Sequence, residues 1–217
     1  MLTKILFLLI LIVPPVYPWS WDTHQNIVEY VYLGLPIEIQ MQLNLTKLKD
    51  GAIIPDRDFK DHKKHHYPYS MMEAKKWLEN DTDISTNLGI ASHYITDSYA
   101  APHNIFGEKP FQHAAFEKQV SKYYPKVSCK DYNLKIEQLD GALTTSKDWS
   151  IWLKTKNIKI PKNEVDEATK MLFSVFLDKL NTTCGIKTEI TEVKYFNKTK
   201  IISIFLIIFV GLYALKR

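Results

Sequence analysis

Histidine is the residue type in this sequence with the most chemistry to offer, and its distribution is uneven. All seven histidines fall within ninety residues, at His24, His62, His65, His66, His93, His103 and His113. Two of them stand four residues before a carboxylate, in the pairs His93/Asp97 and His113/Glu117. On a helix this spacing places both side chains on one face. Because imidazole and carboxylate groups are common zinc ligands in proteins, the pattern favours a metal site over scattered surface histidines.

The stretch SHYITDSYAAPHN, residues 92–104, adds a third candidate to the first of these pairs. Pro102 would end the helix that carries His93 and Asp97, since proline is poorly tolerated inside an α-helix. His103 would then lie beyond the helix end, where it could face a different metal ion.

The elements that must position these residues are expected to be helices. Apolar residues recur at helical spacing over residues 22–33, 83–102, 110–124 and 163–180. In the first segment His24 shares a stripe with apolar residues and should face the core, and Asn163 is a candidate N-cap of the last. No alternating strand pattern is convincing, and 217 residues hold little more than one domain. We therefore expect a single all-α domain of several helices over residues 19–184.

Each end of the sequence carries an apolar segment. Residues 1–18 begin with Lys4 and an apolar run and end in PPVYP, which is typical of a secretory signal peptide. An uncleaved signal anchor is the alternative. Residues 201–215 are uncharged and predict a transmembrane anchor after a polar stalk, residues 185–200, with a buried core helix as the alternative. We expect a single-pass protein of the cell membrane whose helical domain is extracellular.

Charge and cysteine content add little. A net charge of +4 is too mild to argue for a nucleic-acid partner. Cys129 and Cys184 are the only cysteines. In an exported domain they could form one disulfide, and two separate buried thiols remain the alternative.

Several short motifs together resemble one enzyme family. The stretch from Trp19 to His24 is similar to the mature N-terminus of the zinc-dependent phospholipases C and of the related fungal single-strand-specific nucleases. The spacing His93-x3-Asp97-x5-His103 resembles the central ligand motif of that family. The resemblance implies an all-α fold of the zinc-dependent phospholipase C type.

Other motifs extend the resemblance. The pair His113-x3-Glu117 resembles the last ligand pair of the family, with the glutamate that is typical of the phospholipases. The segment GAIIPDRDF, residues 51–59, is similar to the one that supplies a metal-bound aspartate, here Asp56. The segment HHYP resembles the histidine-aromatic ligand step, best matched by His66. His65 or His62 could replace His66, and Asp58 competes with Asp56.

The resemblance implies three zinc ions. Asp97 would bridge two of them, and Asp56 would act first as a ligand and also as a base. The Trp19 ligands are its free α-amino group and its backbone carbonyl, and the amino group is free only if cleavage follows residue 18. The implied ligands are Trp19, His24, Asp56, His66, His93, Asp97, His103, His113 and Glu117.

The expected function is that of a membrane-tethered extracytoplasmic phosphodiesterase. By resemblance it would hydrolyse phospholipids in the manner of a phospholipase C, as a monomer held to the membrane by its C-terminal helix. A single-strand-specific nuclease with the same zinc cluster is one alternative, and only that one brings in nucleic acid. A non-catalytic zinc-binding domain is the other.

Overall fold

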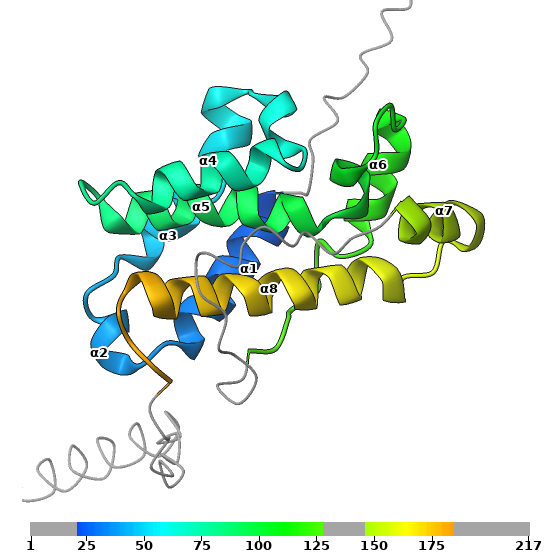
Figure 1. Cartoon of the computed structure of the whole chain (residues 1–217). Coiled ribbons are helices and arrows are strands. Elements are labelled where there is room, and N and C mark those ends of the chain that lie inside the picture. The colour runs from blue at the N-terminus through cyan, green and yellow to red at the C-terminus, as the bar shows by residue number, and fades with distance from the viewer. Residues whose placement is uncertain (1–20, 128–145, 185–217) are drawn as a thin grey trace, which may run out of the picture. The chain divides into compact units, whose positions relative to one another are not determined.

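The computed structural model describes residues 21–127 and 146–184, which form helices and no strand (Figure 1). The prediction of an all-α domain is confirmed. The α-helices are α1 (Trp21–Gly34), α2 (Ile37–Gln40), α3 (Leu45–Gly51), α4 (Tyr69–Leu78), α5 (Ile84–Tyr99), α6 (Pro110–Lys118), α7 (Ser146–Thr155) and α8 (Lys159–Lys179). Three short turns of other geometry are the π-helix η1 (Pro55–Phe59) and the 3-10 helices η2 (His62–His65) and η3 (Ala101–Asn104).

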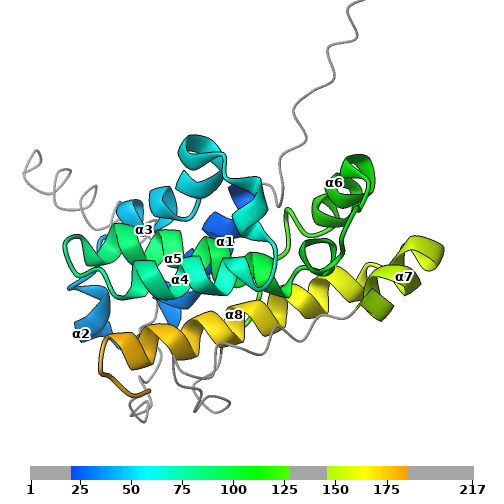
Figure 2. The same ribbon diagram turned by 45° about the horizontal axis from the view of Figure 1, so that its top comes forward.

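Helix α5 is the central element. It begins after Asp83, whose side chain accepts a hydrogen bond from the Thr86 N–H at 3.4 Å. Every residue from Asn87 to Tyr99 is buried. Helices α4, α3, α8 and α1 all pack against it, and two views show α8 running alongside it (Figures 1 and 2). A helix covered on nearly all faces is hydrophobic or small all round, as the sequence indicated.

Two boundaries differ from expectation. Helix α8 begins at Lys159, before the expected cap Asn163, so that Pro161 lies in its first turn. Proline is tolerated there because the first N–H groups of a helix have no intrahelical partner. Helix α5 ends at Tyr99, before Pro102, and the chain continues directly into η3.

Two glycines let α3 and α5 approach closely. A Cβ added to Gly89 would overlap the carbonyl oxygen of Leu48 and lie 2.9 Å from the Cα of Gly51. A Cβ added to Gly51 would lie 2.5 Å from the carbonyl oxygen of Thr86. Glycine is therefore required at both positions, and the contact fixes how far the end of α3 stands from α5.

A small second core supports α6. Phe116 packs edge-on against Trp152, with ring centroids 5.0 Å apart, and Trp149 stacks on Trp152 at 5.2 Å. All three rings are buried, together with Ala101 of η3. This cluster is separate from the main core, which is built around α1, α4, α5 and α8. The ring of Phe116 thus packs α6 against the tryptophans of α7.

The signal peptide, stalk and membrane anchor predicted at the two chain ends are not tested by the structure. The signal peptide 1–18, Trp19, the stalk 185–200 and the anchor 201–215 all lie outside the described residues. Within the described ranges, no helix is both long and apolar enough to cross a membrane. Cys184 is disulfide-bonded; the sequence has one other cysteine, Cys129, which is outside the described residues.

Replacement of Gly89 by alanine tests the close approach of α3 and α5. We expect the variant to lose about 1–3 kcal/mol of unfolding free energy, because the added methyl group overlaps backbone atoms that cannot move aside. Denaturant unfolding followed by circular dichroism measures the change. Alanine is otherwise the better helix former by about 1 kcal/mol, so a stabilised variant would contradict the packing described.

Candidate metal centre

Eight ionisable side chains from six elements converge at one end of α5. They are His24 (α1), Asp56 (η1), His65 (η2), His93 and Asp97 (α5), His103 (η3), and His113 and Glu117 (α6). All eight are buried; they are called the His/Asp cluster below. Burying so many polar and charged groups is costly unless they are paired with one another or with a metal ion. This arrangement is therefore a strong indication of a site.

The orientation of His93 is fixed by the backbone. Its Nδ1 lies 2.8 Å from the carbonyl oxygen of Ala52, directly after α3, and must donate its proton there. In the neutral ring, Nε2 then carries the lone pair. That nitrogen lies 3.2 Å from Asp97 Oδ2 and 3.6 Å from Asp56 Oδ1. The close packing of α3 on α5 is what brings the Ala52 carbonyl within reach.

His65 is oriented by a carboxylate. Its Nε2 lies 3.1 Å from Asp61 Oδ1, and the hydroxyl of Tyr94 donates to the other oxygen of Asp61 at 2.9 Å. The Nδ1 of His65 therefore faces the cluster, 2.8 Å from Asp97 Oδ2 and 3.2 Å from Nε2 of His93. A carboxylate behind a histidine is the usual arrangement that orients a zinc ligand.

The two inward nitrogens of His65 and His93 need a cation between them and Asp97. Both rings have committed their other nitrogen as a donor, so in their neutral forms two lone pairs face each other. A proton can fill this role: burial lowers the pKa of His65, but Asp61 and Asp97 outweigh burial and raise it to about 10. A metal ion is the other cation that fits this place, since the ligand atoms of His65, His93 and Asp97 lie within 4.8 Å of one another.

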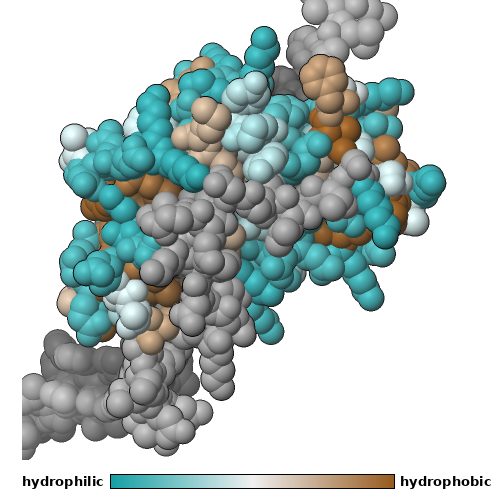
Figure 3. All heavy atoms as spheres, in the orientation of Figure 1, coloured by the Kyte–Doolittle hydropathy of each residue, from teal (hydrophilic) through white to brown (hydrophobic). Residues whose placement is uncertain are grey.

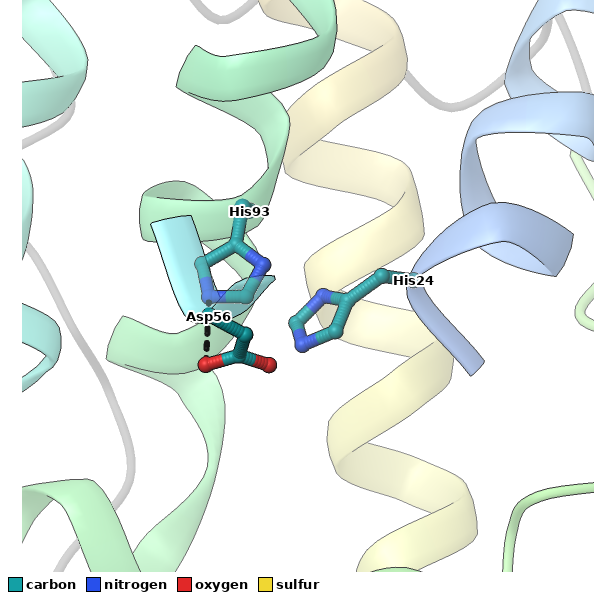
Figure 4. Close-up of side chains that lie close together, drawn as sticks. All are labelled: His24, Asp56 and His93. Atoms are coloured by element: carbon teal, nitrogen blue, oxygen red, sulfur yellow. Dashed lines mark ion pairs between the residues drawn. The ribbon is translucent and has the colours of Figure 1, made fainter. Parts of the chain in front are cut away.

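His24 faces the other carboxylate oxygen of Asp97, Oδ1. Its Nδ1 lies 2.9 Å from the hydroxyl of Thr96, which itself donates to the His93 carbonyl at 2.9 Å. The hydroxyl must therefore accept from His24, whose Nε2 faces the cluster 3.4 Å from Asp97 Oδ1. Burial, reinforced by His93, lowers the pKa of His24 well below its ordinary value, which keeps the ring neutral. The rings of His24 and His93 stack with centroids 4.0 Å apart, and Figure 4 shows the carboxylate of Asp56 beside both.

A second group lies at the α6 end of the cluster. His113 Nε2 is 2.6 Å from Glu117 Oε1, one helical turn further on, and His103 Nε2 is 3.6 Å from the same oxygen. The Nδ1 of His113 lies 3.4 Å from Glu108 Oε1, which orients the ring as Asp61 orients His65. The three side chains come from η3 and α6.

Asp97 joins the two parts. Its Oδ2 faces His65 and His93, and its Oδ1 lies 3.4 Å from His24 and 3.6 Å from His103. Burial alone would raise the pKa of Asp97, but the surrounding imidazoles, His103 and His93 first, hold it well below the usual range. The side chain is therefore an anion that presents one oxygen to each side.

Three sets of side chains have ligand atoms close enough to hold an ion, within 4.8 Å of one another: His24, Asp56 and His93; His65, His93 and Asp97; and His103, His113 and Glu117. The first two sets share His93. Because its Nδ1 is bound to Ala52, His93 can offer only Nε2 to a metal. Carboxylates in every set supply the negative charge that neighbouring divalent cations need.

The residues predicted from sequence fall into three classes of position. His24, Asp56, His93, Asp97, His103, His113 and Glu117 all lie in the cluster. His66 does not: its side chain is 34 % exposed and its Nε2 is 3.9 Å from Glu108, while His65, the alternative, is buried against Asp97. Asp58, the competitor of Asp56, is exposed and paired with Arg57. Trp19 lies outside the described residues.

Sequence reasoning missed the partners that orient the rings: Asp61, Thr96, Glu108 and the Ala52 carbonyl. Asp61 stands four residues before His65, the one spacing signal among them. Glu108 precedes His113 by five residues, which is not a helical pairing distance, Thr96 is 72 residues from His24, and the partner at Ala52 is a backbone atom.

Comparison with known proteins gives one match. The model of a family described as Zinc dependent phospholipase C matches residues 23–182. The matched span contains all eight residues of the His/Asp cluster. No curated protein and no solved structure gives a significant match.

Neighbouring histidines provide a matched pair of variants. We expect His65→Ala to lower zinc affinity by more than the roughly 10–100-fold that loss of an outer partner costs. His66→Ala should keep the zinc content of the parent protein, since its side chain lies outside the cluster. Elemental analysis after dialysis against a zinc buffer measures both, with circular dichroism to check folding. The reverse result would assign the ligand to His66.

Proposed function

The chain belongs to the zinc-dependent phospholipase C family, and from this premise we propose that it is a zinc-dependent phosphodiester hydrolase that cleaves the glycerol-side P–O bond of phospholipids. The match confirms the resemblance seen in the sequence. The observation that carries the proposal is the convergence of His65, His93 and Asp97, two neutral-ring lone pairs and an anion aimed at one point.

We propose three zinc ions. Asp56, His65, His93 and Asp97 would hold one, with His65 in the place first given to His66. His103, His113 and Glu117 would hold a second. His24, Asp97 and the amino terminus at Trp19 would hold the third. The two-sided contacts of the Asp97 carboxylate support its role as a bridge.

Zinc, when bound, lowers the pKa of a coordinated water to about 7 and attracts the negative charge of a phosphate ester. The protein contributes orientation and proton handling. Asp61, Thr96 and Glu108 hold the ligand rings in place. Burial raises the pKa of Asp56, and within the described residues neither of its oxygens is hydrogen-bonded. We assign it first as a ligand and second as the base that accepts a proton from the attacking water.

The substrate phosphate has a place to bind. A cavity of about 240 Å³ is lined by His65, His103 and His113 of the cluster together with His62, His66, Glu108 and Pro110. It gives a ligand access to both metal groups from one side. Histidines not used by the cluster line it too, and they can donate hydrogen bonds to phosphate oxygens.

Phospholipid is favoured over nucleic acid. Glu117 stands where the resemblance places the glutamate of the phospholipases, and the mild net charge offers little attraction to a polyanion. The predicted anchor at residues 201–215 would hold the domain at a membrane, on its extracellular side. The single-strand nuclease and the non-catalytic zinc domain remain the alternatives.

Hydrolysis assays on one zinc-loaded sample separate the three functions. We expect release of phosphocholine from phosphatidylcholine, a loss of about 100-fold or more with EDTA, and recovery with zinc, because the metal supplies several kcal/mol of transition-state stabilisation. Release of mononucleotides from single-stranded DNA instead would identify a nuclease. Zinc binding with neither activity would leave the non-catalytic domain.

Replacing Asp97 by asparagine tests the bridge. We expect the purified variant to lose more than one zinc ion, because both of its oxygens serve the cluster and an amide has no negative charge to offset the cations. Asp58→Asn is the control, since Asp58 is an exposed aspartate outside the cluster. Zinc counting by elemental analysis gives the answer, and full retention in the Asp97 variant would remove the bridging role.

A further inference from the structure

A second, apolar cavity adjoins the phosphate cavity. It has a volume of about 660 Å³, and Tyr67, Tyr69, Ile105 and Phe106 are among its lining residues. Four residues, His62, His66, His103 and Glu108, line both cavities. The two spaces therefore meet at these side chains, polar on the side of the cluster and apolar on the outer side.

Large apolar side chains stand exposed around the apolar cavity. Phe106 is fully exposed, Tyr69 is 59 % exposed and Tyr67 38 %. In the surface view, apolar atoms gather over the part of the molecule where Figure 1 labels α6 (Figure 3). One exposed apolar residue is ordinary, but several around a cavity mark a binding surface.

The segment that carries Phe106 is built to project. Its base is fixed by Asn104, whose amide donates to the carbonyl oxygens of Ser98 at 2.8 Å and Ala100 at 3.2 Å. Gly107 follows with a φ of +78°, which turns the chain sharply back toward α6. A Cβ added to Gly107 would meet nothing within 4 Å. Phe106 thus stands at the tip of a turn, anchored at its base and open outside.

We propose that this turn and the apolar cavity form a docking surface for a phospholipid bilayer, with Phe106 inserted among the acyl chains. The proposal rests on the proposed phosphodiesterase function and names where its substrate enters. A phospholipid is apolar on one side of its phosphate, and the two connected cavities offer the same order of chemistry: phosphate by the cluster, acyl chain beyond His66.

Charge supports lipid over nucleic acid. Among the described residues that line the apolar cavity, Lys63 is the single lysine or arginine. A groove for single-stranded nucleic acid combines its aromatic platforms with a continuous row of cations along the backbone path. Aromatic side chains with a single neighbouring lysine, here Lys63, suit the interface of a membrane instead.

The test places a fluorescent probe at residue 106 of the full-length, zinc-loaded protein. Phe106→Cys carries an environment-sensitive dye, and Met41→Cys is the matched control: Met41 is 75 % exposed and follows α2, which lies at the opposite end from α6 in both ribbon views. Vesicles of phosphatidylcholine and phosphatidylglycerol should shift the emission of residue 106 to the blue, and nitroxide lipids should quench it. The Met41 probe should show neither effect.

This readout needs no turnover, so its failure is separate from failure of the phosphodiesterase. A residue-106 probe that behaves like the Met41 probe overturns the docking surface while leaving hydrolysis open. A response to a single-stranded oligonucleotide and not to vesicles overturns it in favour of nucleic acid.

Kinetics give a second arm. Phe106→Ser should reduce the rate on vesicles by about tenfold or more, the loss expected for one buried phenyl ring. It should leave the rate on a monomeric short-chain phosphatidylcholine unchanged, and Met41→Ser should change neither rate. Equal losses on vesicles and monomers would contradict the proposal, because they would place Phe106 in the chemistry instead of at the membrane.

Discussion

The buried negative charge of Asp97 is the constraint around which this protein is organised. The carboxylate lies inside the most deeply covered helix of the fold, with imidazoles on both sides. A lone carboxylate in such a place would be strongly destabilising. The histidines make the charge tolerable, and the charge in turn draws rings from α1, η2 and η3 to a single point. The helical fold therefore brings together the histidines that stabilise the buried charge of Asp97.

The surrounding elements supply the hydrogen bonds that orient these histidine rings. The three histidines around Asp56 and Asp97 are held by three kinds of acceptor: a backbone carbonyl for His93, a hydroxyl for His24 and a carboxylate for His65. The Ala52 carbonyl is available only because glycines let α3 lie against α5. Packing of the backbone thus determines that His93 offers its Nε2 to a metal. The ring is held rigidly because its hydrogen-bond partner is part of the packed core.

Much of this could be predicted from the sequence, for physical reasons. The spacing of His93 and Asp97 is a property of any helix, and the proline after them had to end it. The choice between His65 and His66 could not be made, because His65 ends a short 3-10 turn, His66 follows it in extended conformation, and only packing decides which side chain is buried. The early start of α8 was hidden by Pro161, which reads as a break but is tolerated in a first turn.

The small aromatic core of Phe116, Trp149 and Trp152 gives the protein a second, separate foundation. His113 and Glu117 stand on it, while His93 and Asp97 stand on the main core. The His/Asp cluster is thus spread over both cores, and the contact between Asp97 Oδ1 and His103 Nε2, at 3.6 Å, joins its two parts. Binding and folding are linked, so a change that loosens the packing of Trp149 and Trp152 would lower the metal affinity of His113 and Glu117. A metal ion bound there would in turn stabilise that packing. Ligand affinity in this fold is thus partly a property of residues that never touch the ligand.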